Sequence, residues 1–582
     1  MLKKLVIFST LLIVFFSASW SLFRSDFFYV HDFTHAARIV EMHKALADGH
    51  FPVRWSSDFA FGYGMPLFEF YAPLPYYAGS IFYWIGFSLV DSIKLLMIIS
   101  TLVIIIGSYK LGKILFGSTG GLLVSAAITL APYRAVNLFV RGAISELWGI
   151  MVLPFILYGI VKIIKSEREK NIFKVAIILL VSLVTLLLSH NLTSLIFLPL
   201  SIMFGAVYLF IVSIDKKNKK EFILTRILLL ASTYFLSILI SSFYLFPTII
   251  EKGFTKVESL IVGNYFDYKL HFLYFRQFFE ANWKYGGSTW GPNDDISFYL
   301  GTGQLISLLF LFYIFAKKIN IKKLSSTFEK KNYLFFTTVG LMMISIFMTL
   351  GHSKVIWDSI NILAFIQFPW RWLSAIIIFA GLSIGFIPFY IKNKFNRYCL
   401  FFLLFFVIIF TNFKYFQPEK YLVDSSEYYY SDQNRIRSEM SKTLPDYIPQ
   451  QISDEALIPT VETGTMLMCE VVQSDIDNSC GFDYKKILDK THKKILKVNL
   501  INAQTIDFSL AYYPGWEAFI DGEKINNIIS NSGKISLSIP SGTHEIMLIF
   551  KDTKVRLISD ILSISGLVIL LLIYFWYYKH ND

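Results

Sequence analysis

Long apolar segments recur along this chain, and they constrain its fold more than any other feature. A run of roughly 17–25 apolar residues can cross the hydrocarbon core of a bilayer as a helix. Backbone polar groups must be satisfied inside the bilayer, so such runs are expected to be helical. About twelve runs qualify, at residues 5–23, 93–113, 119–136, 146–164, 172–189, 192–213, 224–247, 298–316, 333–350, 370–391, 398–413 and 556–578. The sequence therefore predicts a polytopic α-helical membrane protein.

Composition agrees with this prediction and excludes an ordinary soluble enzyme. Of the 582 residues, 55% are hydrophobic and only 16% are charged. Aromatic residues make up 17% of the chain and suit lipid-facing surfaces and interface belts. The first run follows Lys3 and Lys4 and ends near Ser17–Ser19, the outline of a signal peptide. Because many more runs follow, we interpret it as an uncleaved first helix.

The net charge of +12 is explained by the topology of the chain and does not indicate nucleic-acid binding. Basic residues concentrate in short loops between apolar runs, and such loops face the cytoplasm under the positive-inside rule. The loops are Lys162–Lys174, Lys216–Lys220, Lys317–Lys331 and Lys392–Arg397. Residues 76–90 would place two of these loops outside if they crossed the membrane, so we expect them to lie on, or dip into, the outer leaflet. The plasma membrane is then the predicted location, with cytoplasmic termini.

Three parts follow from this topology. They are a transmembrane domain at 1–413, with outer loops at 24–92, 248–297 and 351–369, an extracytoplasmic domain at 414–555, and a last helix with a short cytoplasmic tail at 556–582. Residues 494–500, 535–539 and 544–550 alternate between apolar and polar side chains, as strands do. The turn pairs Asp521-Gly522 and Ser541-Gly542 separate such runs. A small β-sandwich is therefore predicted for 414–555.

Cysteine usage gives no sign of a metal centre. The chain has three cysteines, with no C-x-x-C pair and no zinc-ligand spacing. Cys469 and Cys480 could form a disulfide if residues 414–555 lie outside the cytoplasm. No resident cofactor is predicted, although a divalent metal beside a pair of acids stays an option.

The stretch Val30–Arg38 reads V-H-D-F-T-H-A-A-R and places an acid and three bases where the chain leaves its first apolar run. Residues 32–47 have helical spacing and stop at Gly49, which predicts a short helix along the outer surface. Asp32 at its start could simply be an N-cap. Alternatively, its carboxylate could take the proton of an acceptor hydroxyl during glycosyl transfer from a lipid-phosphate sugar. Burial would raise its pKa and strengthen it as a base.

Other residues predicted on the same face suit a phosphate leaving group or a sugar. Phosphate oxygens need Arg, Lys or His donors. The candidates are Arg371, Arg276, His190 and His352 for the donor phosphate, His35, Arg38, Trp55 and Trp290 for the sugar or acceptor, and Glu69 as a second acid, with Arg141, Glu146 and Lys354 nearby. Structural alternatives stay open: Arg371 between two tryptophans fits an interface anchor, and His190 fits the cap of a tight turn. Tyr513 and Trp516 could stack on an acceptor or belong to a core.

Several of these stretches together resemble a known group. The segment His31–Trp55, followed by Phe61–Pro66, resembles the first outer loop of the GT-C superfamily of polytopic glycosyltransferases. Within it, the likeness is to the membrane domain labelled 6-pyruvoyl-tetrahydropterin-synthase-related and to YfhO-type proteins. Further matches are Ser189–Asn191, Ile366–Trp372 and, in the outer domain, Tyr512–Lys524.

The resemblance implies a GT-C-like fold, a polyprenyl-phosphate sugar donor and Asp32 as the catalytic base of an inverting transfer. Many members have a second acid beside the first, but Phe33 follows Asp32 here, so a metal-assisted pair would need Glu69 or Asp58. We expect an integral membrane glycosyltransferase whose acceptor is an envelope glycan, lipid or protein. The alternatives are a non-enzymatic transporter or flippase of lipid-linked saccharides and an envelope scaffold. Few ionisable residues lie inside the spans, which favours surface chemistry.

Overall fold

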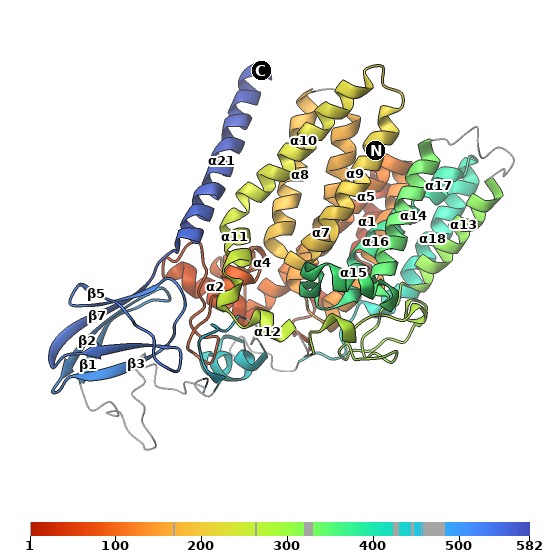
Figure 1. Cartoon of the computed structure of the whole chain (residues 1–582). Coiled ribbons are helices and arrows are strands. Elements are labelled where there is room, and N and C mark those ends of the chain that lie inside the picture. Colours follow the sequence, from red (N-terminus) through yellow and green to blue (C-terminus); the bar gives the residue numbers. More distant parts are fainter. Residues whose placement is uncertain are drawn as a thin grey trace.

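The computed structural model describes residues 2–166, 169–261, 265–318, 330–422, 430–443, 447–454, 457 and 483–581. Its helices form a bundle, and a β-sheet domain lies beside one end of that bundle (Figure 1). Within the described residues, 10 helices are long and apolar enough to cross a membrane, and Thr302–Lys317 is a shorter apolar helix. The chain is a multi-pass helical membrane protein with a β-domain before its last helix, as the sequence predicts.

The long helices connect at alternate ends of the bundle (Figure 1). They are α1 (Leu2–Ser19), α5 (Leu89–Thr129), α7 (Ile144–Lys165), α8 (Glu169–Ser189), α9 (Asn191–Ser213), α10 (Lys219–Ile240), α13 (Thr302–Lys318), α14 (Lys330–Thr349), α16 (Leu373–Ile384) with α17 (Phe386–Tyr390), α18 (Lys394–Asn412) and α21 (Lys554–Asn581). Both termini and the basic α7–α8 and α9–α10 connections lie at one end (Figure 1). The β-domain lies at the other end (Figure 1), and the assignment of that end to the outer face stays a prediction.

Helix α5 contains a reversal at Gly117, where φ is 81° and ψ is 178°. Ser125 Oγ on one side of it donates a hydrogen bond to the carbonyl of Ile105 on the other, at 3.1 Å. Twenty residues of straight helix would separate these two positions by about 30 Å. The element is therefore a hairpin of two helices, which confirms the separate runs expected at 93–113 and 119–136.

Residues 76–90 do not form a membrane-spanning helix, and they lie at the end of the bundle that carries the β-domain (Figure 1). Helix α4 (Leu74–Trp84) has 11 residues, which at 1.5 Å per residue is about half the thickness of the hydrocarbon core. At its C-terminal end, Trp84 and the following Ile85 are 78% and 66% exposed. Exposed apolar side chains on a short helix fit burial in the outer leaflet.

Helix α2 (His35–Ala47) packs against α4 and carries the predicted catalytic region on its N-terminal side. Its N-cap is Thr34, without a side-chain cap. Asp32 lies in the preceding turn, so the capping interpretation of Asp32 is wrong. The helix ends as predicted, because Gly49 has φ 84° and His50 N–H donates to Ala45 O at 2.9 Å. These are marks of a Schellman ending.

The β-domain consists of two antiparallel sheets, ordered β1-β2-β7-β4-β5 and β3-β6. The strands are β1 (Asp483–Asp489), β2 (Lys493–Leu500), β3 (Gln504–Ala511), β4 (Trp516–Ile520), β5 (Glu523–Ile525), β6 (Lys534–Ile539) and β7 (Gly542–Phe550). Strands β2, β6 and β7 contain the three alternating runs of the sequence. Asp521 and Gly522, with φ of 51° and 88°, form the predicted turn between β4 and β5. Cys469 and Cys480 lie outside the described residues.

The β-domain is docked on the first outer loop. Trp55 is fully buried, and its ring centroid lies 6.1 Å from Tyr513, 5.5 Å from Trp516 and 5.4 Å from Phe550. Ala511 N–H at the end of β3 donates to the Tyr63 carbonyl at 2.8 Å. Trp55 and Trp516 therefore anchor an internal interface, where neither ring is open to a sugar.

Two histidines face each other across the same interface. The rings of His50 and His492 lie 5.1 Å apart, and each has a buried Nδ1 without a hydrogen-bond partner among the described residues. Burial, then the nearby His492 and Arg54, lowers the pKa of His50 from 6.5 to about 3. The docked state therefore requires a neutral ring at His50.

Acidification is expected to weaken this docking. A group that takes up its proton near pH 6.5 when exposed, but only near 3 when docked, favours docking above pH 6.5 and loses that contribution as the pH falls toward 3. Thermal unfolding of the full chain in detergent, measured at decreasing pH, should show it. His50→Gln should flatten the pH dependence in this window; an unchanged slope would contradict the assignment.

The α5 hairpin requires a glycine at its closest approach. A Cβ on Gly121 would lie 2.8 Å from Lys113 N and Tyr109 O, so Gly121→Ala should destabilise the chain by about 1–3 kcal/mol. Gly340 in α14 is the matched control, because nothing lies within 4 Å of the position that a Cβ would take there. Gly340→Ala should leave the melting temperature in detergent unchanged or slightly raised, because alanine favours a helix more than glycine does. Equal melting temperatures for the two variants would argue against the tight hairpin.

Candidate active site

The candidate site lies where the turn before α2 meets the segment between α6 (Pro132–Ala135) and α7. Main-chain hydrogen bonds fix this meeting: His31 N–H donates to Val140 O at 3.1 Å, and Asp32 N–H donates to Arg141 O at 2.9 Å. The Asp32 side chain is 43% exposed. A carboxylate open to ligands is therefore held beside Arg141 by the backbone itself.

His35 orients the exposed face of Asp32. Its Nδ1 lies 3.1 Å from Arg38 Nη1 and 2.7 Å from the Tyr76 hydroxyl. Arginine can only donate, so Nδ1 accepts and the ring proton is on Nε2. That nitrogen lies 3.8 Å from Asp32 Oδ2. Burial lowers the pKa of His35 to about 4, so the ring is neutral and directs an N–H toward Asp32.

The pKa of Asp32 differs in direction from the sequence-based expectation. Burial does raise it, but the interaction with His35 and the charges of Arg141 and Arg38 outweigh burial and hold the pKa well below its usual range. The cause is that cations suited to a phosphate also face the carboxylate. An anion bound among them would offset their field and raise the pKa of Asp32 again.

Arg141 is the arginine most firmly placed in the site. Its Nη1 donates to Glu146 Oε2 at 2.6 Å and to Asn137 Oδ1 at 2.5 Å. Its guanidinium lies 4.8 Å from the ring centre of Trp370. Tyr133 OH donates to the other oxygen of Glu146. Arg141 was named on the outer face but not in the predicted donor set; an arginine followed by an acid at the start of an apolar run was the available signal.

Arg371 and His190 join this cluster, in different ways. Arg371 Nη1 donates to Ile366 O at 2.7 Å, while its buried Nε has no partner among the described residues. Arg371 also lies close enough to Arg141 to interact electrostatically. His190 caps α9, because its Nδ1 accepts from Thr193 N–H at 3.1 Å. The capping interpretation of His190 is thereby confirmed, although its ring still interacts with Glu146.

The other predicted site residues lie elsewhere. Arg276 is 56% exposed and pairs with Glu280 at 3.4 Å. His352 is exposed in a short turn, and Trp290 is 81% exposed on the second outer loop. No contact joins any of them to Asp32 within the part of the chain that the structure describes.

The proposed partners for a metal-assisted pair of acids are engaged by cations. Asp58 Oδ2 pairs with Lys44 at 2.6 Å and Oδ1 with Arg437 at 2.8 Å. Glu69 is fully buried and faces Arg556. Across the described residues, no group of three or more His, Cys, Asp or Glu side chains could hold a metal ion.

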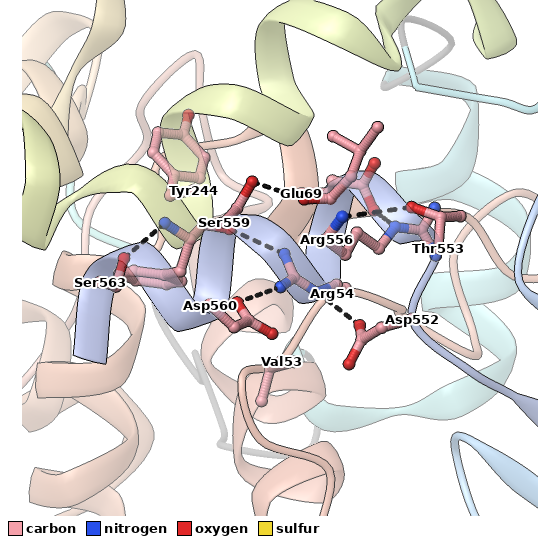
Figure 2. A network of polar contacts seen from close by, with 12 residues as sticks. Val53, Arg54, Glu69, Tyr244, Asp552, Thr553, Arg556, Ser559, Asp560 and Ser563 are labelled. Carbon is pink, nitrogen blue, oxygen red and sulfur yellow. Dashed lines mark hydrogen bonds and ion pairs between the residues drawn. The ribbon is translucent and has the colours of Figure 1, made fainter. Parts of the chain in front are cut away.

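Glu69 belongs to a network that ties the first outer loop to α21 (Figure 2). Glu69 Oε2 lies 2.9 Å from Arg556 Nε and Glu251 Oε2 lies 2.8 Å from Arg556 Nη2. Tyr513 OH donates to Glu69 Oε1 at 2.8 Å. Burial, opposed by Arg556 and reinforced by Glu251, raises the pKa of Glu69 to about 8. A neighbouring arginine, Arg54, pairs with two acids at the start of α21.

Comparison with known proteins gives distant likenesses. No family model matches the sequence. An uncharacterized protein of Lactococcus lactis subsp. cremoris (strain MG1363) is 26% identical over 356 residues, which cover 59% of this chain and 53% of the relative. The chain thus spans about half the length of the curated relative that it matches. The expected kinship with YfhO-type proteins stays a prediction.

Two of the solved structures that are similar to the chain illustrate the level of likeness. The oligosaccharyltransferase of Archaeoglobus fulgidus in the apo form has a TM-score of 0.41 at 12% identity, covering 72% of this chain and 56% of that one. The arabinofuranosyltransferase AftD from Mycobacteria has a TM-score of 0.39 at 13% identity, covering 73% of this chain and 28% of that one. TM-scores this low assign neither a fold nor a function, so the candidate site rests on its own geometry.

Arg556 is expected to contribute strongly to the stability of the fold. Arg556→Met leaves the buried carboxylate of Glu251 and the buried acid Glu69 without their cation and should cost about 3–5 kcal/mol. The matched control is Arg276→Met, which breaks an exposed Arg–Glu pair and should cost less than about 1 kcal/mol. Thermal unfolding in detergent and limited proteolysis of the β-domain measure both. Similar losses of stability in the two variants would contradict this role of Arg556.

Proposed function

We propose that the chain is an integral membrane glycosyltransferase of GT-C type. It transfers a sugar from a polyprenyl-phosphate donor to a hydroxyl of a cell-envelope glycan, lipid or protein at the outer face. The observation that carries the proposal is convergence in space. One partly exposed carboxylate, Asp32, interacts with Arg38 and Arg141, and Arg371 interacts in turn with Arg141 and Glu146. The three arginines come from three different segments of the chain.

The charge of this site suits a phosphate. Three guanidinium groups, of Arg38, Arg141 and Arg371, face two carboxylates, of Asp32 and Glu146, and His35 is neutral. Three positive charges against two negative ones leave one positive charge to be neutralised. Arginines hold phosphate oxygens through charge-assisted hydrogen bonds. The bound phosphate in turn raises the pKa of Asp32, so the base gains strength only when the donor is in place.

The transfer is a single displacement at the anomeric carbon. The acceptor oxygen forms a bond to that carbon as the bond to the phosphate oxygen breaks, and its electrons leave with the phosphate. Asp32 takes the proton of the acceptor hydroxyl. His35 Nε2–H orients the carboxylate, and Arg141 and Arg371 stabilise the negative charge of the leaving phosphate. The configuration at the anomeric carbon is inverted.

One observation favours a second candidate, a transporter of lipid-linked saccharides. Arg134 is fully buried beneath the site, and its Nη2 donates to Thr101 Oγ1 of α5 at 3.2 Å. Its Nε and Nη1 have no hydrogen-bond partner among the described residues. An unpaired charge inside a helix bundle is a mark of a polar pathway.

Replacing the base tests the proposal. Asp32→Asn keeps the shape of the side chain but cannot accept the proton, so sugar transfer from a radiolabelled polyprenyl-phosphate donor should fall about 10²–10⁴-fold. Asp267→Asn is the matched control, because Asp267 accepts from Lys269 N–H as a turn cap and asparagine caps equally well. Its transfer rate should stay at the wild-type value.

Two outcomes would contradict the proposal. In the first, Asp32→Asn transfers sugar at the wild-type rate with normal expression. In the second, wild-type proteoliposomes move a labelled lipid-linked saccharide across the bilayer but transfer no sugar, which would select the transporter.

A further inference from the structure

The second outer loop contains a polar cavity of about 130 Å³ that is separate from the Asp32 cluster. Amides, carboxylates and a hydroxyl line most of it, from Gln277, Glu280, Asn282, Asn293, Asp294 and Ser297. A volume of this size holds on the order of ten water-sized groups, which is the scale of one sugar ring.

Hydrogen bonds shape the walls of this cavity in advance. Asp294 Oδ1 accepts from Thr289 N–H at 2.8 Å, and its Oδ2 accepts from Gln277 Nε2 at 2.7 Å. Directly after Asp294 in the chain, the Asp295 carbonyl accepts from Gly286 N–H at 2.7 Å. The cavity is thus preformed, which lowers the entropic cost of binding.

The polar groups at its mouth retain hydrogen-bonding capacity. Asn282 makes no hydrogen bond to the described residues, and Asn293 only accepts from Arg276 Nη2, at 3.4 Å. Glu280 has one contact, at 3.4 Å, with Arg276. Side-chain amides offer both donors and acceptors, and a carboxylate accepts on two oxygens. Such a set matches neighbouring hydroxyls, which both donate and accept.

Charge excludes a phosphate here. Glu280, Asp294 and Asp295 are three acids, and Arg276 and Lys284 pair with the first and the last of them. Three negative charges against two positive ones leave a net negative charge. An anionic group is repelled from this cavity, whereas the Asp32 cluster attracts one.

The cavity is joined to the Asp32 cluster by shared walls. The ring of its lining residue Phe298 lies 5.7 Å from Trp370, the ring on which Arg141 rests at 4.8 Å. His31 Nε2 lies 2.8 Å from the carbonyl of Tyr285, next to the lining residue Lys284. Packed side chains and one backbone contact therefore connect the wall of the cavity to the segment that holds Asp32.

We propose that this cavity is a subsite for an uncharged saccharide, the sugar portion of the acceptor. That the bound sugar belongs to the acceptor rests on the proposed function, whereas saccharide binding itself does not. Trp290 lies on the turn closed by Asp294 and is 81% exposed. Its ring offers a stacking face to a second sugar unit at the rim.

Binding is tested first, without any assay of transfer. Saturation-transfer NMR on the full chain in detergent, with methyl glycosides of glucose, galactose and N-acetylglucosamine as probes, should show contact with at least one of them. Asn282→Ala should weaken that binding about tenfold, through loss of the amide's hydrogen bonds. Asn218→Ala is the matched control, because Asn218 is an exposed amide at the opposite, basic end of the bundle. It should bind as the wild type does.

Steady-state kinetics then test whether the bound saccharide is the acceptor. With the methyl glycoside that binds best as acceptor, Asn282→Ala should raise its KM about tenfold and leave the KM of the lipid-phosphate donor unchanged. Wild-type glycoside binding in both variants would overturn the subsite. A rise in donor KM alone would overturn its role as the acceptor side. If glycosides bind and Asn282→Ala weakens them, but no sugar is ever transferred, the subsite stands and the proposed function fails.

Discussion

Two buried arginines hold together the end of the molecule on which any chemistry here depends. Arg556 lies between Glu69 and Glu251, and Arg54 lies between Asp552 and Asp560. Together these pairs join the two large outer loops to the last helix and the residues just before it. Arg556, Glu69 and Glu251 are buried, so removing one of them changes the charge balance in a low-dielectric surrounding, whereas Asp552 is 41% exposed. The β-domain, which precedes that helix, is held against the first outer loop through Trp55. The first outer loop is thus held by parts of the chain hundreds of residues away.

Much of this architecture could be predicted from local pattern. Apolar runs fix the spans because the bilayer leaves the backbone few options, and alternating residues fix strands such as β2 and β7. The α5 hairpin was readable because Gly117 separates two runs. Pairings across hundreds of residues were not readable. Glu69 has the residue type of a catalytic acid, and Trp55 has that of a residue that stacks on sugars. Only the folded structure shows that Glu69 pairs with Arg556 of the last helix and that Trp55 packs on Trp516 of the β-domain.

The candidate site was predictable in its members more than in its electrostatics. A carboxylate near arginines was expected at the outer face, and Asp32 does interact with Arg38 and Arg141, while Arg371 interacts with Arg141 and Glu146. The catalytic and phosphate-binding roles of these residues stay predictions. Burial was expected to raise the pKa of Asp32, but nearby positive charges lower it. The sign of a pKa shift depends on which charges lie within a few ångströms. Sequence spacing gives no such distances. Arg141 likewise joins the site through a contact that sequence spacing does not reveal, because its carbonyl accepts a main-chain hydrogen bond from the turn that holds Asp32.

The clamp formed by the two arginines also has a consequence for biogenesis. Arg54 and its partner Asp560 are separated by 506 positions in the chain. During synthesis, the segment that contains Arg54 is made long before its counter-ions leave the ribosome. This end of the bundle therefore cannot assemble span by span. Its ion pairs close only when the final helix is in place, so truncated products would lack them.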